Sequence, residues 1–225
     1  MTGGWPAFCR DLLEQFPLIF TGLVQTLRLT AIISLTGLLG GIVVLYLTLS
    51  RSPIVRRLTQ AYISFFIGMP LIVLLFLLYY GLPQWGIRLS PFVVAVVGFT
   101  LNVAAYNAAY LTSAYNGLEQ TELEAGRAQG FSHRQVFALL TLPQVLRMSV
   151  PALTNQVILN LKDSTLAFLI QYTEFFARIQ ELASTNFQFF KAYALAALVY
   201  LLLVSAIVLA ARAVEKRVII PGLLG

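Results

Sequence analysis

The segment TELEAGRAQGFSHRQVFALLTLP, residues 121–143, decides the fold, because it is a polar interruption in an otherwise apolar chain. Two stretches within it, Thr121-Glu122-Leu123-Glu124 and Ser132-His133-Arg134-Gln135, match the capping box that starts a helix. Gly130 lies between them and can adopt the left-handed conformation that ends a helix. We therefore expect a helix–bend–helix hairpin, with a first helix of about eight residues and a second helix that Pro143 limits.

The composition around this hairpin indicates an integral membrane protein. Of the 225 residues, 59% are hydrophobic and 11% are charged, whereas soluble domains are nearer about 45–50% and 25%. The net charge of +6 comes from basic residues spread between apolar runs, which favours membrane flanks and lipid contact over a nucleic-acid-binding stripe. Cys9 is the only cysteine, so no disulfide forms within the chain. Residues 1–17 lack the pattern of a cleaved signal peptide.

Five apolar runs are long enough to cross a bilayer, which takes roughly 20 residues. They lie near residues 29–49, 58–80, 91–115, 148–172 and 192–211. Residues 8–28 mix charged and apolar side chains, so an interfacial lead-in helix is favoured there over a sixth span. The whole chain, residues 1–225, is therefore expected to form a single transmembrane domain.

The distribution of lysine and arginine predicts the orientation. Nine of these residues follow the first, third or fifth run: Arg51, Arg56, Arg57, Arg127, Arg134, Arg147, Arg212, Lys216 and Arg217. Four fall on the opposite side: Arg10, Arg88, Arg178 and Lys191. The positive-inside rule places the larger group in the cytoplasm. We expect the hairpin and the C-terminus inside and the N-terminus outside.

Two features of the spans concern how helices pack and break. Gly68-Met69-Pro70 interrupts the second run, because proline offers no N–H to the carbonyl four residues earlier. In lipid that carbonyl needs another partner, and the break is either part of a transport pathway or a packing kink. Gly37 and Gly41 share one helix face and favour close approach of a second helix.

Polar side chains within the spans are candidates for a solute pathway. Lys162 and Asp163 lie roughly 17 Å into the fourth run if it begins near Pro151, where each charge costs on the order of 2.5–3.5 kcal/mol. Either each finds a partner on another helix, or the helix opens and Asp163, Ser164 or Thr165 caps the next turn. A structural network and contact with a charged permeant both remain possible. The uncharged polar groups either bond between helices or line the pathway; they are Asn102, Tyr106, Asn107, Asn155 and Asn160.

The hairpin resembles the EAA loop of bacterial ATP-binding-cassette (ABC) importer permeases. The resemblance rests on Glu124-Ala125-Gly126, on Gly130 four residues after Gly126, and on Leu140-Thr141-Leu142-Pro143, with the family's spacing intact. Gly126 replaces the family's second alanine, and Leu140 replaces its isoleucine. In the family this loop is the coupling helix, which docks into the nucleotide-binding subunit. The resemblance implies that role for Glu124, Ala125, Gly126, Gly130, Phe131, Leu142 and Pro143.

Further motifs between about residues 21 and 212 are similar to polar amino-acid uptake permeases of the histidine, arginine, glutamine and cystine type. They are Tyr79-Tyr80-Gly81-Leu82-Pro83, Leu101-Asn102, Ala104-Ala105-Tyr106, Leu142-Pro143-Gln144, Asn155-Gln156 and Lys162-Asp163-Ser164-Thr165-Leu166. The resemblance implies an all-α membrane protein with the type I importer permease fold and a five-helix core. Relatives often carry Glu and Arg at the positions of Ala109 and Thr112. Relatives also commonly have Arg before a Gly-Thr-Pro motif, whereas this chain has Ile67 before Gly68-Met69-Pro70. These departures leave the identity of the amino acid open.

We therefore expect the permease subunit of an ATP-driven importer in the bacterial inner membrane, carrying a polar amino acid or a close derivative. The candidate pathway residues are Gly68, Pro70, Asn102, Tyr106, Asn155, Asn160, Lys162, Asp163 and Thr165. The resemblance implies two cytoplasmic ATPase subunits, a second permease subunit of the same or a homologous chain, and an extracytoplasmic amino-acid-binding protein.

The chain has no phosphate-binding loop of the G-x-x-x-x-G-K-[ST] type. ATP and Mg are therefore expected in the partner ATPase, and this chain is expected to hold no cofactor, catalytic residue or metal. Two alternatives remain: an ion-driven transporter with Lys162 and Asp163 as a relay, and a non-transporting scaffold that uses the hairpin to recruit a partner.

Overall fold

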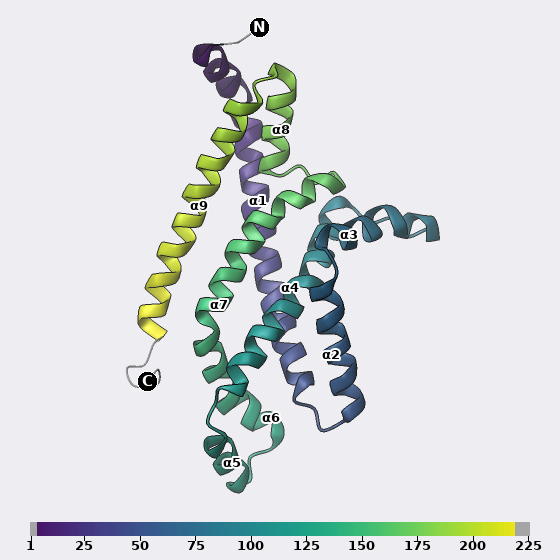
Figure 1. Cartoon of the computed structure of the whole chain (residues 1–225), viewed down its shortest axis with the longest axis vertical. Coiled ribbons are helices and arrows are strands. Elements are labelled where there is room, and N and C mark those ends of the chain that lie inside the picture. Colours follow the sequence, from purple (N-terminus) through teal and green to yellow (C-terminus); the bar gives the residue numbers. More distant parts are fainter. Residues whose placement is uncertain (1–3, 219–225) are drawn as a thin grey trace. The chain divides into compact units, whose positions relative to one another are not determined.

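The computed structural model describes residues 4–218, and every regular element in that range is a helix (Figure 1). The α-helices are α1 (Trp5–Thr48), α2 (Pro53–Gly68), α3 (Leu71–Phe76), α4 (Pro91–Asn116), α5 (Gln120–Ala128), α6 (His133–Gln135), α7 (Leu142–Asp163), α8 (Phe175–Asn186) and α9 (Phe189–Val218). Two π-helical turns, η1 (Leu77–Gly81) and η3 (Val136–Thr141), and two 3₁₀ segments, η2 (Leu82–Trp85) and η4 (Ser164–Ile170), complete the set.

Four continuous helical stretches in the described residues are long and apolar enough to cross a membrane. They are Trp5–Thr48, Pro91–Asn116, His133–Ile170 and Phe189–Ala213. A fifth crossing is obtained if α2 and Leu71–Trp85 are counted as one broken span. The break lies at Met69 and Pro70, where the sequence predicted it. The all-α architecture with up to five spans agrees with the expected five-helix core.

Helix α1 differs from the expected arrangement of a lead-in helix followed by a separate span. It runs without interruption through 44 residues, or about 66 Å at 1.5 Å per residue, so the expected boundary at residue 28 is absent. The charges that suggested the boundary do not stop a helix, and no glycine or proline caps one there. Phe8 and Ile19 in the first half of α1 are buried against residues of α8 and α9, which gives this half a protein partner.

The second helix of the hairpin does not end before Pro143, which corrects the sequence-based expectation. Helix α6 passes through the π-helical turn η3 into α7. A proline in a regular α-helix crowds the carbonyl four residues back and leaves it unpaired. In membrane helices, local π-helical adjustments can give the freed backbone groups new partners. The same arrangement occurs at Pro83, where η1 ends two residues before the proline. Proline therefore modifies these helices without terminating the segment.

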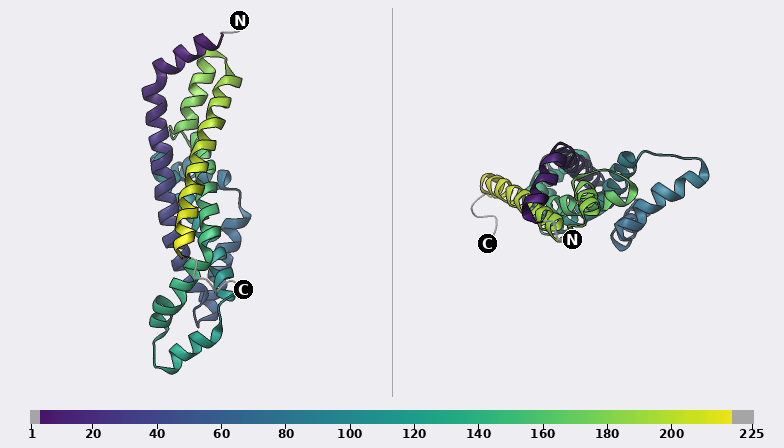
Figure 2. Two further views of the ribbon diagram at one scale, coloured as in Figure 1. Left: turned by 90° about the vertical axis from the view of Figure 1, so that its left-hand side faces the viewer. Right: turned by 90° about the horizontal axis from the view of Figure 1, so that it is seen from above.

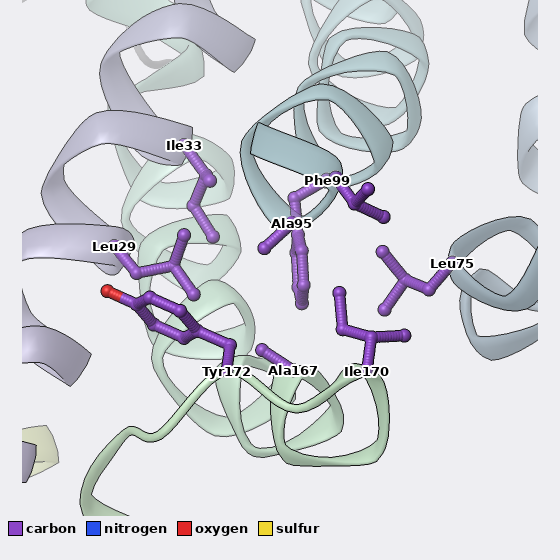
Figure 3. Close-up of a cluster of buried hydrophobic side chains, with 9 residues drawn as sticks. Leu29, Ile33, Leu75, Ala95, Phe99, Ala167, Ile170 and Tyr172 are labelled. Carbon is purple, nitrogen blue, oxygen red and sulfur yellow. The ribbon is translucent and has the colours of Figure 1, made fainter. Parts of the chain in front are cut away.

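The described chain divides into two compact units, which together contain all the spans. Unit 1 consists of residues 4–34, 70–99 and 157–207, and unit 2 consists of residues 35–69, 100–156 and 208–218. The core of unit 1 includes Leu29 and Ile33 of α1, Phe99 of α4 and Ile170 at the end of η4 (Figure 3). A second cluster in unit 1 joins α8 to the first halves of α1 and α9, which lie side by side (Figures 1 and 2).

Unit 2 is held together by close packing of α1 against α4. A Cβ atom added at Gly37 would lie 2.4 Å from Val103 Cγ1, and one added at Gly41 would lie 2.6 Å from Asn107 Cβ. Both distances are too short for a real Cβ contact, so only glycine permits this approach. The packing role predicted for Gly37 and Gly41 is confirmed.

Candidate functional site

The bend between α5 and α6 is closed by backbone hydrogen bonds around Gly130. The Phe131 N–H donates to the Gly126 carbonyl at 3.1 Å, and the Gly130 N–H donates to the Arg127 carbonyl at 3.0 Å. This pair of bonds is the Schellman arrangement, which requires a left-handed residue after the helix. Gly130 has φ +86°, as the sequence predicted. The direction in which the chain leaves α5 is therefore fixed by the backbone.

The two predicted capping boxes have different outcomes. At Ser132 the box is present: the Ser132 hydroxyl accepts from the Gln135 N–H, and the Gln135 side chain accepts from the Ser132 N–H at 2.8 Å. At Thr121 the prediction is wrong. Helix α5 begins at Gln120, and its N-cap Glu119 makes no side-chain capping bond. Thr121 is therefore inside the helix, where its backbone cannot take the extended conformation of an N-cap.

The hairpin is packed through a face of small and apolar side chains. Gly126 is buried, and a Cβ atom added to it would lie 2.6 Å from Leu140 Cδ1 and 3.9 Å from Phe131 Cδ2. The two positions at which this loop departs from the EAA pattern, 126 and 140, therefore contact each other. Leu123 and Val136 are also buried. These contacts hold α5 against η3.

Three further contacts attach the hairpin to the rest of unit 2. The Gln144 side chain in α7 donates to the Glu122 carboxylate at 2.8 Å. The Tyr46 ring in α1 packs edge-on against Phe137 with ring centroids 4.9 Å apart, and His133 lies against the same tyrosine. No local sequence pattern indicates the Glu122–Gln144 bond, because the bend and the π-helical turn separate the two residues.

The outward face of α5 presents small and charged residues. Glu124, Ala125, Arg127 and Ala128 are exposed, and Phe131 is 37% exposed beside them. Leu142 is partly buried and Pro143 is exposed at the start of α7. A short helix with two alanines on its outer face lets another surface approach its backbone closely. This arrangement can dock into a groove.

Lys162 and Asp163 lie where α7 changes to the tighter helix η4. The Thr165 hydroxyl donates to the Lys162 carbonyl at 2.9 Å, and the Ser164 hydroxyl donates to the Leu161 carbonyl at 2.8 Å. Asp163 makes no side-chain capping bond. Of the two arrangements predicted, the helix changes here, but the hydroxyls bond backward and do not cap the following turn. Among the side chains that the structure describes, neither charge is in a salt bridge.

A pocket of about 370 Å³ in unit 1 contains part of the predicted pathway. Lys162 and Thr165 line it together with side chains of α8 and α9: Phe176, Tyr193, Ala196, Ala197 and Tyr200. The Phe176 and Tyr193 rings are stacked with centroids 6.1 Å apart. Asp163 is exposed and is not among the lining residues. The pocket therefore has mostly apolar and aromatic walls, and Lys162 and Thr165 border it.

Asn102 supplies the hydrogen bond that Pro70 cannot make. Pro70 lacks the N–H that would bond to the Phe66 carbonyl four residues earlier, and the Asn102 side-chain amide donates to that carbonyl at 2.8 Å. The Tyr62 hydroxyl donates to the neighbouring Leu101 carbonyl at 2.7 Å. Two side-chain hydrogen bonds therefore hold α2 to α4 on the N-terminal side of the break. Around Gly68 there is open space, since nothing lies within 4 Å of an added Cβ.

The remaining candidates are spread over both units. The Asn160 amide donates to the Ser34 hydroxyl at 3.0 Å, a bond between helices of unit 1. Tyr106 is partly buried in α4, and Asn155 is exposed on α7. The structure therefore places Lys162 and Thr165 at one pocket. Separately, Asn102 bonds to the end of α2, which is followed by the break at Gly68 and Pro70. In the described residues, no three His, Cys, Asp or Glu side chains are grouped as metal ligands.

Sequence reasoning missed Glu174, a buried carboxyl group at the start of α8. Its side chain caps α8 by accepting from the Phe176 and Ala177 N–H groups at 2.9 and 2.8 Å. An acidic residue directly before an apolar run is a recognised helix-start signal. The partners that it binds on distant helices leave no trace in the local sequence.

Comparison with known proteins shows what this arrangement is similar to. A family model described as "Binding-protein-dependent transport system inner membrane component" matches residues 37–220. The probable amino-acid ABC transporter permease protein PatM of Vibrio harveyi is 35% identical over 192 residues, covering 84% of this chain and 86% of that protein. The L-cystine transport system permease protein TcyB of Bacillus subtilis (strain 168) is 30% identical over 210 residues, covering 92% and 90%.

The same similarity is found in three dimensions. A solved crystal structure of an amino acid ABC transporter with histidines superposes with a TM-score of 0.85 at 26% identity. The match covers 96% of this chain and 100% of the other. The similarity therefore extends along most of the chain and is not confined to the hairpin.

Proposed function

The chain belongs to the family of binding-protein-dependent transport system inner membrane components, and we propose that it carries a polar amino acid or a close derivative into the cytoplasm. As a member of this family it is the membrane-spanning permease subunit of an ABC transporter, and the ATPase is a separate subunit. This membership decides against the ion-driven transporter and the non-transporting scaffold as alternatives.

The amino-acid substrate is supported by relatives that match nearly the whole chain. PatM is described as a probable amino-acid permease, and TcyB as an L-cystine permease. The solved structure at 26% identity is described as an amino acid ABC transporter with histidines. Lys162 is exposed beside the pocket, so its ammonium group can pair with a solute carboxylate. The apolar and aromatic walls of the pocket can contact the rest of the solute.

The hairpin is the element that we assign to coupling, and its rigid bend is the single observation that carries the proposal. Glu124, Ala125, Gly126, Gly130, Phe131, Leu142 and Pro143 are the proposed coupling residues. Because backbone bonds around Gly130 fix the hairpin, a displacement of α5 by a partner would be transmitted to η3 and α7. ATP and Mg would be bound by that partner, and this chain would supply only the docking surface.

The complete importer would contain several further subunits. We propose two cytoplasmic ATPases, a second permease subunit of the same or a homologous chain, and an extracytoplasmic amino-acid-binding protein. The orientation follows from the basic residues near the ends of the spans, with the N-terminus outside and the hairpin and C-terminus in the cytoplasm. Residues 8–28 would then extend from the first span on the outer side.

The proposed pathway residues are found in each of the two units. In unit 1, Lys162 and Thr165 would contact the solute at the pocket, and Asp163 would present a further polar group. In unit 2, Tyr106 and Asn155 would present polar groups to the solute. Asn102 and Asn160 would act by holding helices, since their side-chain amides already bind Phe66 and Ser34. Gly68 and Pro70 would provide the break at which the second span changes direction.

A two-step experiment tests the substrate. The binding protein encoded with this permease is screened against the twenty amino acids and cystine by thermal shift, and the stabilising compound is then tested for ATP-dependent uptake into proteoliposomes containing the assembled transporter. We expect one small group of polar amino acids to stabilise the binding protein and to be taken up. ATP-dependent uptake of a different class of solute, such as a sugar, with no uptake of any amino acid would contradict the proposal.

A further inference from the structure

Glu174 is a buried carboxyl group whose two oxygens accept four hydrogen bonds. Besides the two N–H groups of α8, it binds the Thr26 hydroxyl at 3.0 Å and the Tyr200 hydroxyl at 3.4 Å. Its residue exposure is 0%. Burial raises the pKa of the Glu174 carboxyl, and the hydrogen bonds from Phe176, Ala177, Thr26 and Tyr200 act in the opposite direction. Each donor therefore stabilises the charged form in a site that would otherwise disfavour it.

These bonds connect three helices of unit 1. Thr26 belongs to α1, Glu174 caps α8, and Tyr200 belongs to α9. The Thr26 hydroxyl makes two hydrogen bonds: it donates to the Glu174 carboxylate and accepts from the Phe175 N–H at 3.0 Å. The Tyr200 ring additionally packs edge-on against Phe175 with centroids 5.6 Å apart. Glu174 is thus the common partner of groups that are far apart in the sequence.

A glycine in α1 permits this close approach. Gly22 lies four residues before Thr26, so the two share a helix face. A Cβ atom added at Gly22 would lie 3.0 Å from the Glu174 carbonyl oxygen and 2.8 Å from Arg178 Cγ. Any larger residue would push the first turn of α8 away from α1. The side chain of Thr26 reaches Glu174 only because α8 lies this close.

The groups that Glu174 holds also form walls of the pocket at Lys162. Phe176, whose N–H binds the carboxylate, lines the pocket. Tyr200, whose hydroxyl binds the same oxygen, lines it as well. Glu174 itself is not a lining residue. It therefore sets the positions of two aromatic walls without contacting the space between them.

We propose that Glu174 is a positioning residue for solute transport, which fixes Phe176 and Tyr200 in the geometry that the Lys162 pocket requires. Removal of one of its donors loosens the contact of α8 with α1 and α9 and changes the shape of the pocket. The effect on transport rests on the proposed function, since it assumes that the solute passes this pocket. The effect on the pocket itself does not depend on that assumption.

The geometric part is tested by labelling a buried pocket residue. Ala196 lines the pocket and is 4% exposed, so Ala196→Cys in a Cys9→Ser background reports access to the pocket. Thr26→Val and Glu174→Gln should raise the rate of maleimide labelling roughly fivefold, the change expected for loss of about one hydrogen bond. Thr21→Val is the matched control, because the exposed Thr21 hydroxyl bonds only to the Pro17 carbonyl of its own helix. Equal labelling in Thr26→Val and Thr21→Val would overturn the proposal.

The functional part is tested in the reconstituted full transporter. ATP hydrolysis is measured with the unloaded and the solute-loaded binding protein and is expressed per folded permease. Thr26→Val and Glu174→Gln should lower the solute-stimulated part roughly fivefold and leave the basal part unchanged. Glu181→Gln, on the exposed face of α8 where Glu181 pairs with Arg178, should leave both parts unchanged.

The outcomes separate the two proposals. If basal and stimulated hydrolysis fall in proportion in the Glu174 and Thr26 variants, the role is only structural and the positioning proposal is wrong. If the wild-type transporter shows no stimulation by any amino acid, the proposed function is wrong, and the labelling result still decides whether Glu174 shapes the pocket. If Glu174→Gln fails to fold, Thr26→Val removes a single hydroxyl contact to Glu174 and gives the same comparison.

Discussion

At the scale of single residues, Asn102 shows how a membrane helix tolerates a proline. Its amide satisfies the Phe66 carbonyl that Pro70 leaves without a donor. An unpaired buried carbonyl costs about 1–3 kcal/mol. We expect Asn102→Leu to lower the free energy of unfolding by that amount, measured as a loss of thermal stability of the purified protein in detergent.

The matched control for Asn102 is Asn155→Leu, because Asn155 is an exposed asparagine on α7. A further variant, Pro70→Ala, returns an N–H to position 70. In that background Asn102→Leu should cost less, because the Phe66 carbonyl then has a second potential donor. Equal losses of thermal stability for Asn102→Leu and Asn155→Leu would show that the hydrogen bond from Asn102 to the Phe66 carbonyl does not stabilise the protein.

A second residue-scale prediction concerns the contact between Gly126 and Leu140. A Cβ atom at position 126 would crowd Leu140 Cδ1 at 2.6 Å, although alanine is favoured over glycine in a helix by about 1 kcal/mol. Gly126→Ala should therefore be more stabilising in a Leu140→Ala background than in the wild type, with a coupling energy of about 0.5–3 kcal/mol. Thermal unfolding of the four proteins measures it. Additive effects within about 0.3 kcal/mol would mean that the two positions do not interact.

At the scale of elements, the two hydroxyl residues of the hairpin should differ in their contribution to stability. Ser132 caps α6 through a complete capping box, whereas Thr121 lies inside α5. Ser132→Ala should destabilise the hairpin by about 1 kcal/mol, and Thr121→Ala should change it little. Hydrogen exchange of the amides in residues 120–141 reports both. A larger effect of Thr121→Ala than of Ser132→Ala would contradict the helix starts described above.

The helices could be predicted from the sequence wherever local chemistry decides their ends. The expected third span, residues 91–115, agrees with α4 (Pro91–Asn116), because Pro91 begins it and Gly117 follows it. The bend at Gly130 and the box at Ser132 were predicted for the same reason. The continuous α1 and the passage through Pro143 were not, because tertiary packing and π-helical turns outweigh local signals there.

The candidate site was predictable only in part, for a related reason. Lys162 and Thr165 stand out as polar residues in an apolar run, and the structure brings them to one pocket. Their neighbours Tyr193 and Tyr200 come from a helix about thirty residues further along the chain, and no spacing rule connects such positions. Glu174 was missed because its partner Thr26 is 148 residues away. Contacts of that range are set by the fold.

At the scale of the whole molecule, the orientation can be tested with the single native cysteine. Cys9 is exposed on α1 and is proposed to lie outside the cell. A membrane-impermeant maleimide should label Cys9 in intact spheroplasts. Arg212→Cys in a Cys9→Ser background should be labelled only after permeabilisation, because Arg212 is proposed to be cytoplasmic. The reverse pattern would invert the assigned topology.

The central claim is that a partner ATPase drives solute import through the hairpin, and variants at Gly130 test it most directly. Gly130 has φ +86°, a conformation that asparagine tolerates and a β-branched residue does not. Uptake and stimulated ATP hydrolysis are measured in proteoliposomes for the wild type, Gly130→Asn and Gly130→Val. We predict near-normal coupling for Gly130→Asn, and insertion without solute-stimulated hydrolysis or uptake for Gly130→Val. Wild-type uptake and stimulated hydrolysis in Gly130→Val would contradict the claim.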